Sequence, residues 1–342
     1  MTYTSPITAA ALLASVAFSS AANADALYAT GMAQLRVPDA ARPLEGFLWY
    51  PTEQTEGSIH AHGNMVWEAI RVIPDAPVAD GARPLLLLSH GMFGNARNQA
   101  WLAEAMTQQG YIVAAIDHPG TTTFNRDPDQ RRMLWERPRD ISRALDHILS
   151  DEGLSVDPDR IYMAGHSLGG WTAVALAGGL FEAERMDAFC EAGLDDLVCG
   201  IFAAWNVAET SEDRAAMGRD LSDARITAIA SFDLGGTQFF TPESLAQMPT
   251  PMMVIGAPVA NSGIDLDVES RALIAALPEG TPYLEPEGLA HFDFLGVCTP
   301  QAMEILMEEE PDDAMVCEDG TDARRAEHAM IAQAVQAFFD AH

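Results

Sequence analysis

Positive charge is scarce in this chain of 342 residues. Only 19 Lys and Arg side chains stand against 50 Asp and Glu, which leaves a net charge of −31. A surface this acidic repels phosphate backbones, and it also disfavours anionic membrane surfaces. The charge therefore argues against nucleic acid as a partner and is typical of a highly soluble protein.

Long hydrophobic runs are also missing, because no stretch reaches the roughly 20 apolar residues that a membrane span needs. The nearest is a short apolar run at Ile7–Phe18, and Ala22-Asn23-Ala24 after it has the small-x-small pattern that signal peptidase cuts. No Lys or Arg precedes the run, which departs from the usual signal pattern. We predict a signal peptide at 1–24, one domain over 25–342, and a periplasmic or secreted protein.

Cysteine is rare, and its spacing excludes the common zinc sites. The four cysteines form no CxxC or Cys/His pattern, so no metal is expected. They fall as two local pairs, Cys190 with Cys199 and Cys298 with Cys317. Four cysteines allow three connectivities, and proximity favours these two bridges, which an oxidising compartment would permit.

Strand-like and helix-like runs alternate through the middle of the chain. This order predicts an α/β fold with a mostly parallel central sheet flanked by helices. The expected strands are Leu44–Tyr50, Leu85–Ser89, Tyr111–Asp117, Arg160–Gly165, Ile226–Phe232, Pro251–Gly256 and Thr281–Leu284. The expected helices are Asn98–Gln109, Arg139–Leu149, Trp171–Leu180, Val268–Leu277 and Ala323–Phe339.

Two segments interrupt this alternation, and each carries one cysteine pair. Residues 181–223 are acidic and lie between a helix and a strand, so we predict a cap insertion over the site. Residues 292–321 include an acidic run at Glu308–Asp313. The run lacks the ligand spacing of an EF-hand loop, which favours a solvated surface over a cation site.

The strongest motif is Gly165-His166-Ser167-Leu168-Gly169-Gly170. It follows a predicted strand and opens a helix, which is the setting of a nucleophile elbow. The tight turn strains the serine backbone and needs tiny residues two positions before and after it. It also exposes the hydroxyl and directs the first N–H groups of the helix at the reaction centre. Ser167 is therefore the candidate nucleophile.

An elbow of this kind needs a second oxyanion donor from a loop after an earlier strand. His90-Gly91-Met92-Phe93-Gly94 follows Leu85–Ser89 and is similar to the HG-type oxyanion loop. We predict an oxyanion hole made by the backbone N–H groups of Met92 and Leu168.

The general base should follow the last strand, because the order along the chain in this architecture is Ser, acid, His. Of the nine histidines, His291 fits best, with small or aromatic neighbours on a loop after Thr281–Leu284. His328 and His342 lie in or after the final helix, and His166 belongs to the elbow itself.

Two positions are open for the acid that orients the base. Asp233 ends the strand Ile226–Phe232, while Asp265, with Asp267 behind it, lies in the loop after Pro251–Gly256. The acid should sit at the carboxyl end of a strand, which favours Asp233 and keeps Asp265 as the alternative.

With these residues, the chain resembles bacterial dienelactone-hydrolase-like members of the α/β-hydrolase superfamily and, more distantly, the secreted platelet-activating-factor acetylhydrolases. The resemblance runs from about Leu44 to Phe339. It rests on Ser89-His90-Gly91-Met92, Asp117-His118-Pro119-Gly120, Arg137-Pro138-Arg139-Asp140-Ile141, the Ser167 elbow and His291-Phe292-Asp293-Phe294.

The resemblance implies an α/β-hydrolase fold and hydrolysis of short-chain acyl esters without a metal or an organic cofactor. The acetylhydrolase pattern takes its acid from the strand after the nucleophile helix, the position of Phe232-Asp233. True dienelactone hydrolases use a cysteine nucleophile where this chain has Ser167, so that family name does not carry a substrate.

The sequence thus predicts a serine esterase that acts on a small-molecule or lipid-like ester through an acyl-enzyme. The alternatives are a peptidase, lipase or polyester hydrolase on the same scaffold, or a non-catalytic secreted binding protein. Trp171, Phe202 and Trp205 are candidates to line an acyl pocket. The oligomeric state is open.

Overall fold

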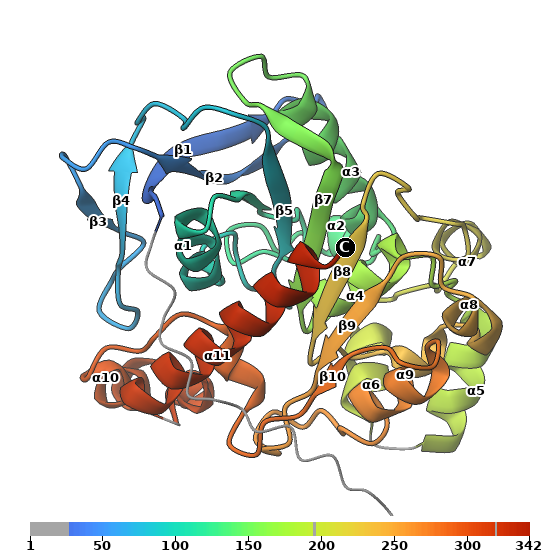
Figure 1. Cartoon of the computed structure of the whole chain (residues 1–342). Coiled ribbons are helices and arrows are strands. Elements are labelled where there is room, and N and C mark those ends of the chain that lie inside the picture. Colours follow the sequence, from blue (N-terminus) through green and yellow to red (C-terminus); the bar gives the residue numbers. More distant parts are fainter. Residues whose placement is uncertain (1–26, 194–195, 319) are drawn as a thin grey trace, which may run out of the picture.

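A ten-stranded sheet forms the centre of the protein in a computed structural model that describes residues 27–193, 196–318 and 320–342 (Figure 1). The strand order is β10-β9-β8-β7-β5-β6-β2-β1-β4-β3. The predicted signal peptide lies outside the described residues.

The six strands from β10 to β6 are parallel, as the alternation of strands and helices predicts. They are β5 (Arg83–Ser89), β6 (Ile112–Ile116), β7 (Val156–His166), β8 (Ala228–Phe232), β9 (Met252–Ile255) and β10 (Tyr283–Leu284). Successive side chains of a strand point to opposite faces, so a strand covered on both faces is apolar throughout. In β5, Leu85 and Leu87 belong to one core cluster, and Leu86 and Leu88 to the other.

At the other end of the sheet, the predicted strand Leu44–Tyr50 is present as β2, and the strands β1, β3 and β4 beside it were not predicted. β1 (Ala29–Val37) pairs antiparallel with β2 (Leu44–Thr52), which in turn pairs antiparallel with β6. Two short strands, β3 (Ile59–Ala61) and β4 (Ile70–Pro74), extend this edge. These strands mix polar and apolar residues, because several of their side chains face solvent.

Helices cover both faces of the sheet. One core cluster packs against α3 (Glu136–Leu149) and α4 (Leu168–Leu176), and the other against α1 (Ala100–Gln108) and α11 (Thr321–Asp340). Shorter helices occupy the loops: α2 (Pro128–Arg131), α8 (Pro242–Ala246), α9 (Ser270–Ala276) and the 3-10 turn η1 (Thr237–Phe239). None of the helices in the described ranges is both long and apolar enough to cross a bilayer.

The segment predicted as a cap is helical. It contains α5 (Ala183–Gly193), α6 (Leu197–Ala204) and α7 (Ser211–Met217). A disulfide between Cys190 and Cys199 links α5 to α6, and Phe202 and Met217 join the core beneath. The bridge closes a short loop and so limits the freedom of the unfolded chain there.

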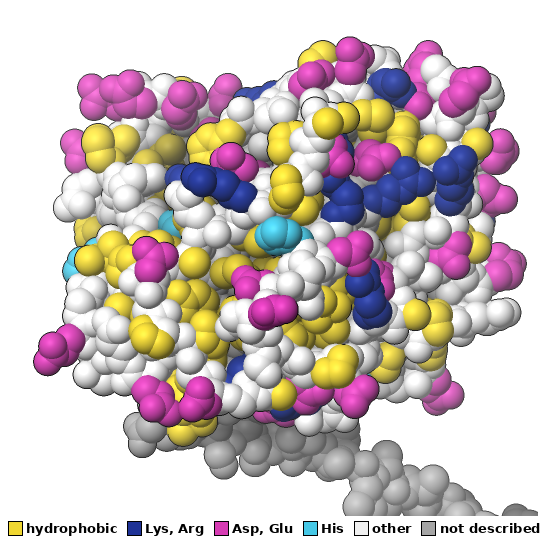
Figure 2. Space-filling model, turned by 90° about the horizontal axis from the view of Figure 1, so that it is seen from above, with side chains coloured by type: hydrophobic (Ala, Val, Ile, Leu, Met, Phe, Trp, Pro, Cys, Tyr) yellow, Lys and Arg dark blue, Asp and Glu magenta, His cyan; other side chains and the backbone are white. Residues whose placement is uncertain are grey.

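The second excursion has a small core of its own. It contains η2 (His291–Phe294), α10 (Ala302–Glu309) and η3 (Pro311–Cys317), and a disulfide joins Cys298 to Cys317. The acidic run at Glu308–Asp313 is exposed, as expected for a solvated surface. Acidic side chains are also frequent along the rim of the face in Figure 2, where the basic side chains gather in a few groups.

Candidate active site

Ser167 lies at the sharp turn between β7 and α4. Its φ of 56° and ψ of −120° place it in a region that residues with a side chain rarely occupy. Such strain typically costs on the order of 1–3 kcal/mol and persists only where the surroundings enforce it. Here the Ser167 N–H donates to the Phe232 carbonyl at 2.9 Å, which ties the turn to the end of β8.

Two glycines make this turn possible. A Cβ atom at Gly165 would lie 2.0 Å from the Gly169 carbonyl oxygen, and one at Gly169 would lie 1.9 Å from the Ser89 oxygen. Both distances are impossible for carbon and oxygen, so neither position accepts a side chain. The spacing of the elbow motif therefore has a direct steric cause in this molecule.

The loop His90–Gly94, the predicted oxyanion loop, lies directly against the turn. A Cβ atom at Gly91 would be 3.1 Å from the Ser167 Cβ, so the loop backbone touches the serine. Among the described residues, neither the Met92 N–H nor the Leu168 N–H donates to a protein acceptor. Leu168 opens α4, where the first N–H groups of a helix have no internal partner. Both donors are free to bind a developing oxyanion.

His291 and Asp233 are in direct contact. The His291 Nδ1 lies 2.6 Å from one Asp233 oxygen, and both side chains are buried. The other Asp233 oxygen accepts the Ala257 N–H at 3.0 Å. Asp233 also has a positive φ, 39°, at the turn that follows β8. The carboxylate is thus held from β9 while it faces the imidazole.

His166 anchors the backbone of His291. Its Nε2 lies 2.7 Å from the His291 carbonyl oxygen, and the two rings are 4.6 Å apart. Burial lowers the pKa of His166 well below its usual value, and the His291 ring adds to that shift. His166 is therefore neutral and donates to that carbonyl. This contact brings His291 next to the residue that precedes Ser167, although the Ser167 hydroxyl and the His291 Nε2 form no hydrogen bond with each other.

The alternative acid lies elsewhere. Asp265 is exposed, and its carboxylate accepts the N–H groups of Asp267 and Val268 within its own turn. Glu269, from the same region of the chain, is buried. Its carboxylate accepts the N–H groups of Gly236 and Thr237 at 2.9 and 2.7 Å. Glu269 thereby holds the loop that follows Asp233.

Glu269 makes the stability of this loop depend on pH. Burial raises its pKa to about 7, although its two backbone hydrogen bonds act in the opposite direction. The folded protein therefore holds this proton more tightly than the unfolded chain, so the linked stabilisation is present below about pH 4.5 and is lost towards pH 7.

We expect Glu269→Gln, which cannot titrate, to remove this part of the pH dependence. In the wild type the linked free energy is on the order of 3 kcal/mol across pH 4.5 to 7. Calorimetric unfolding between pH 4.5 and 7 measures this pH dependence. Glu279→Gln, at an exposed position, is the matched control. Equal slopes of Tm against pH in wild type and Glu269→Gln would contradict the assignment.

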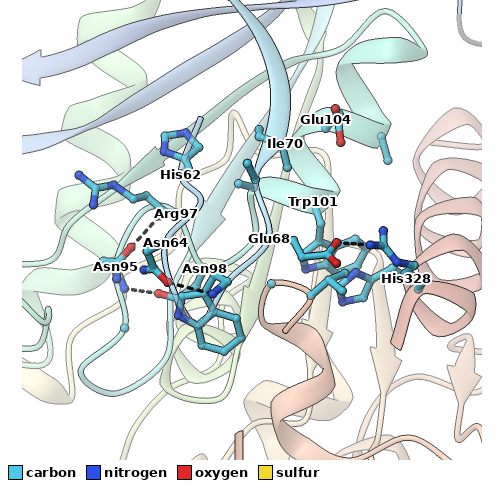
Figure 3. Close-up of a pocket in the computed structure, with 18 of the residues that line it drawn as sticks. His62, Asn64, Glu68, Ile70, Asn95, Arg97, Asn98, Trp101, Glu104 and His328 are labelled. Carbon is cyan, nitrogen blue, oxygen red and sulfur yellow. Dashed lines mark hydrogen bonds and ion pairs between the residues drawn. The ribbon is translucent and has the colours of Figure 1, made fainter. Parts of the chain in front are cut away.

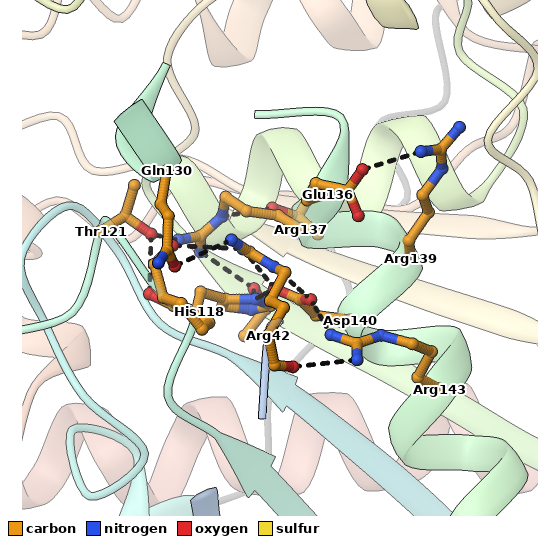
Figure 4. A network of polar contacts seen from close by, with 12 residues as sticks. Arg42, His118, Thr121, Gln130, Glu136, Arg137, Arg139, Asp140 and Arg143 are labelled. Carbon is orange, nitrogen blue, oxygen red and sulfur yellow. Dashed lines mark hydrogen bonds and ion pairs between the residues drawn. The ribbon is translucent and has the colours of Figure 1, made fainter. Parts of the chain in front are cut away.

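A buried polar network supports the oxyanion loop from behind (Figure 4). Arg137 of α3 is only 1% exposed, and its guanidinium donates to the His90 carbonyl and to the hydroxyls of Ser89, Thr121 and Thr172. Burial lowers its pKa to about 9, so it is charged at neutral pH. His90 precedes the Met92 donor by two residues and Thr172 lies one turn after Leu168, so Arg137 connects the two elements that carry the free N–H groups.

The same network contains a second Ser–His–Asp chain. His118 Nδ1 lies 3.1 Å from Asp140, and its Nε2 lies 2.9 Å from the Ser89 hydroxyl. Burial lowers the pKa of His118 to about 3, so its ring is neutral. Burial alone would raise the pKa of Asp140, but hydrogen bonds from His118 and Arg42 outweigh it and hold that pKa at about 2. Ser89, His118 and Asp140 are each 0% exposed, so no substrate reaches the Ser89 hydroxyl.

We expect Arg137→Gln to lower kcat by about 10²-fold with little change in KM, because a displaced oxyanion donor is felt only in the transition state. Thermal stability should also fall, since four hydrogen bonds are lost. The assay is therefore run below the Tm of the variant. The control is Arg139→Gln on the same helix, which loses only a surface ion pair with Glu136. A variant that is destabilised but keeps its kcat would show a structural role alone.

Arg137, Asp140 and His118 belong to motifs that carry the family resemblance, but nothing in the sequence predicts a role for them. All three aromatic candidates for an acyl pocket, Trp171, Phe202 and Trp205, are buried in the core. Trp205 ends α6 and contacts Phe93 of the oxyanion loop, with ring centroids 5.4 Å apart. The segment 181–223 therefore contacts the predicted oxyanion loop through Trp205.

A cavity of about 640 Å³ borders the oxyanion loop (Figure 3). Phe93, Gly94 and Asn95 form one wall, and α1 and α11 contribute Trp101 and His328, whose rings stack at 3.7 Å. Within the described ranges, no cluster of His, Cys, Asp and Glu side chains has the arrangement of a metal site.

Comparison with known proteins agrees with this architecture. The family model described as serine aminopeptidase, S33, matches residues 80–190. Cutinase est1 of Thermobifida alba is 35% identical over 96 residues, which make up 27% of this chain and 29% of that enzyme. Cutinase 2 of Thermobifida cellulosilytica is 33% identical over 94 residues, 26% of this chain and 32% of that one. The matched segments thus span only about a third of these relatives.

A solved structure of a ferulic acid esterase from Streptomyces cinnamoneus is similar over nearly the whole chain. The TM-score is 0.61 at 21% identity, and the match covers 94% of this chain and 92% of that one. Together with the strand order and the helices on both faces, this likeness shows an α/β-hydrolase fold, as the sequence predicts.

Proposed function

We propose that this chain is a serine hydrolase that cleaves carboxylic esters, with Ser167 as nucleophile, His291 as general base and Asp233 as the orienting acid. One observation carries the proposal: a strained serine lies beside two free backbone N–H groups, and a buried imidazole–carboxylate pair contacts the residue that precedes this serine. That combination supplies a nucleophile, an oxyanion site and a base on one edge of the sheet.

The reaction has two steps. The Ser167 Oγ attacks the ester carbonyl carbon while the His291 Nε2 takes the hydroxyl proton, and the N–H groups of Met92 and Leu168 bind the oxyanion. The carbon–oxygen bond to the alcohol then breaks, and the alcohol leaves with the proton from His291. Water adds to the acyl-enzyme by the same route, releases the acid and restores Ser167. Asp233 stabilises the imidazolium of both steps.

Labelling with a fluorophosphonate, followed by peptide mapping, tests the proposal. The expected result is one modified residue, Ser167, and turnover of p-nitrophenyl esters that depends on acyl length. Tributyrin, polyester film and aminoacyl amides extend the panel to lipase, polyester hydrolase and peptidase activity. The matches to cutinases favour the esters, while the serine aminopeptidase description makes the amides a necessary comparison. An unlabelled, inactive protein would indicate a binding protein on this fold instead.

We also propose that the protein is exported and that residues 181–223 act as a cap over the site. The two disulfides support export, because such bonds persist in oxidising compartments. The contact of Trp205 with Phe93 supports the cap, since it joins this segment to the oxyanion loop. N-terminal sequencing of the mature protein after expression with its leader tests the cleavage after residue 24.

A further inference from the structure

Three arginines near the predicted oxyanion loop form no ion pair with any residue that the structure describes. The chain contains no lysine, so all 19 of its basic side chains are arginines. Ten of them form ion pairs. The guanidinium groups of Arg97, Arg126 and Arg131 form neither an ion pair nor a hydrogen bond with any described residue, although acidic side chains outnumber arginines more than twofold. The Nε atom of Arg131 is buried in this state.

Each of the three guanidinium groups lies over an aromatic ring instead. The Cζ of Arg126 is 4.4 Å from the centre of the Phe93 ring, and that of Arg131 is 5.3 Å from the Trp205 ring. The Cζ of Arg97 is 5.4 Å from the ring of Phe124. Such contacts hold a guanidinium in place and leave N–H donors free for an acceptor.

The rings of Phe93 and Trp205 place Arg126 and Arg131 close to the predicted oxyanion loop. Phe93 follows the Met92 donor in the chain, and Trp205 packs against it from the cap segment. Phe93 and Arg97 also line the cavity next to the oxyanion loop, where Figure 3 shows Arg97 beside His62. Arg132, the next residue after Arg131, pairs with the buried Asp213 of α7. This ion pair fixes the loop that carries Arg131 to the segment 181–223.

The arginines oppose the field of the rest of the molecule. A net charge of −31 repels an anionic substrate, and only a local group of positive charges near the site reverses that repulsion. A neutral ester needs no such group, and the ammonium group of an aminopeptidase substrate would be repelled by it. Free guanidinium groups match carboxylate and phosphate oxygens in geometry and charge.

We infer that the ester bound at this site carries a negatively charged group, a carboxylate or a phosphate, which Arg97, Arg126 and Arg131 recognise. The inference rests on the proposed esterase activity of Ser167. The charged group lies away from the scissile bond, on the side of the substrate that faces Phe93 and Trp205. The three arginines then determine specificity and take no part in bond breaking.

Three acetate esters of matched size test the inference: 4-acetoxybenzamide as the neutral reference, 4-acetoxybenzoate and 4-acetoxyphenyl phosphate. We expect kcat/KM to be at least about tenfold higher for a charged ester than for the amide at low salt, and the advantage to shrink towards 0.5 M salt. Comparison of the two charged esters separates a carboxylate from a phosphate. The double variant Arg126→Gln/Arg131→Gln, and Arg97→Gln alone, should lose the preference for the charged esters over the neutral ester.

The control is Arg83→Gln. Arg83 also lies over an aromatic ring, 4.6 Å from the centre of Tyr28, but at the amino end of β5, the opposite end of the strand from Ser89. The substitution removes the same charge and should keep the preference. If the wild type hydrolyses the neutral ester at least as well as the charged ones, or if the variants retain the preference, the inference is wrong and the esterase proposal stands. If it hydrolyses none of the three, the inference is overturned, and the esterase proposal falls with it when Ser167 also takes no fluorophosphonate label.

Discussion

Ser167→Ala is expected to lower ester hydrolysis by about 10⁴- to 10⁶-fold, because the reaction then lacks its nucleophile and only the oxyanion donors and substrate binding remain. Alanine removes one oxygen from a half-buried position and keeps the Cβ, so the turn and its N–H bond to Phe232 should persist. Steady-state hydrolysis of a p-nitrophenyl ester and thermal unfolding measure the two effects. The Tm should change by no more than a few degrees.

Ser89→Ala is the matched control for this result. Ser89 also belongs to a Ser–His–Asp chain, but one without solvent access. Its loss removes one of the four acceptors of Arg137, so we expect only a modest reduction in rate and unchanged fluorophosphonate labelling of Ser167. A protein that stays active without the Ser167 hydroxyl, or that loses its label in Ser89→Ala alone, would move the nucleophile away from the elbow.

Residue patterns in the sequence predict the parallel half of the sheet well. Buried strands such as Leu85–Ser89 are apolar on both faces, and the helices between them have clear ends. The patterns fail at the antiparallel end of the sheet, where the burial of β1 alternates only over its last four residues and is irregular before them. The predicted last strand, Thr281–Leu284, shortens to two residues, because β10 lies at the edge of the sheet and pairs only with β9.

The nucleophile elbow can be recognised in the sequence because the steric contacts that require its glycines are local. Gly165 and Gly169 are required by contacts within a few residues of Ser167 and with the adjacent strand. The support behind the oxyanion loop is not local. Arg137, His118 and Asp140 come from α3 and from the loop after β6, and they meet Ser89 of β5 only when these elements pack. No rule of residue spacing predicts such a network from the sequence.

The choice between the two candidate acids also depends on contacts that form only when the strands pack. Both Asp233 and Asp265 follow a strand, so position along the chain leaves them open. The strand order resolves their geometry, because β8 is the direct neighbour of β7 and its end lies beside the Ser167 turn. The carboxylate of Asp233 faces His291 there, while the turn of Asp265 uses its carboxylate to bind its own N–H groups.

Asp233→Asn should therefore lower kcat by about 10⁴-fold, and Asp265→Asn should change it by less than about threefold. The amide introduced at position 233 can still accept the Ala257 N–H through its oxygen, so the fold is retained. Its NH₂ group would then face the His291 Nδ1 and favour the tautomer whose Nε2 carries the proton, which cannot accept one from Ser167. The measurement is kcat for a p-nitrophenyl ester in both variants, with far- and near-UV circular dichroism to verify folding. A loss confined to Asp265→Asn would assign the acid to the loop after β9, and equal activity in both variants would leave His291 without the orienting partner that this mechanism needs.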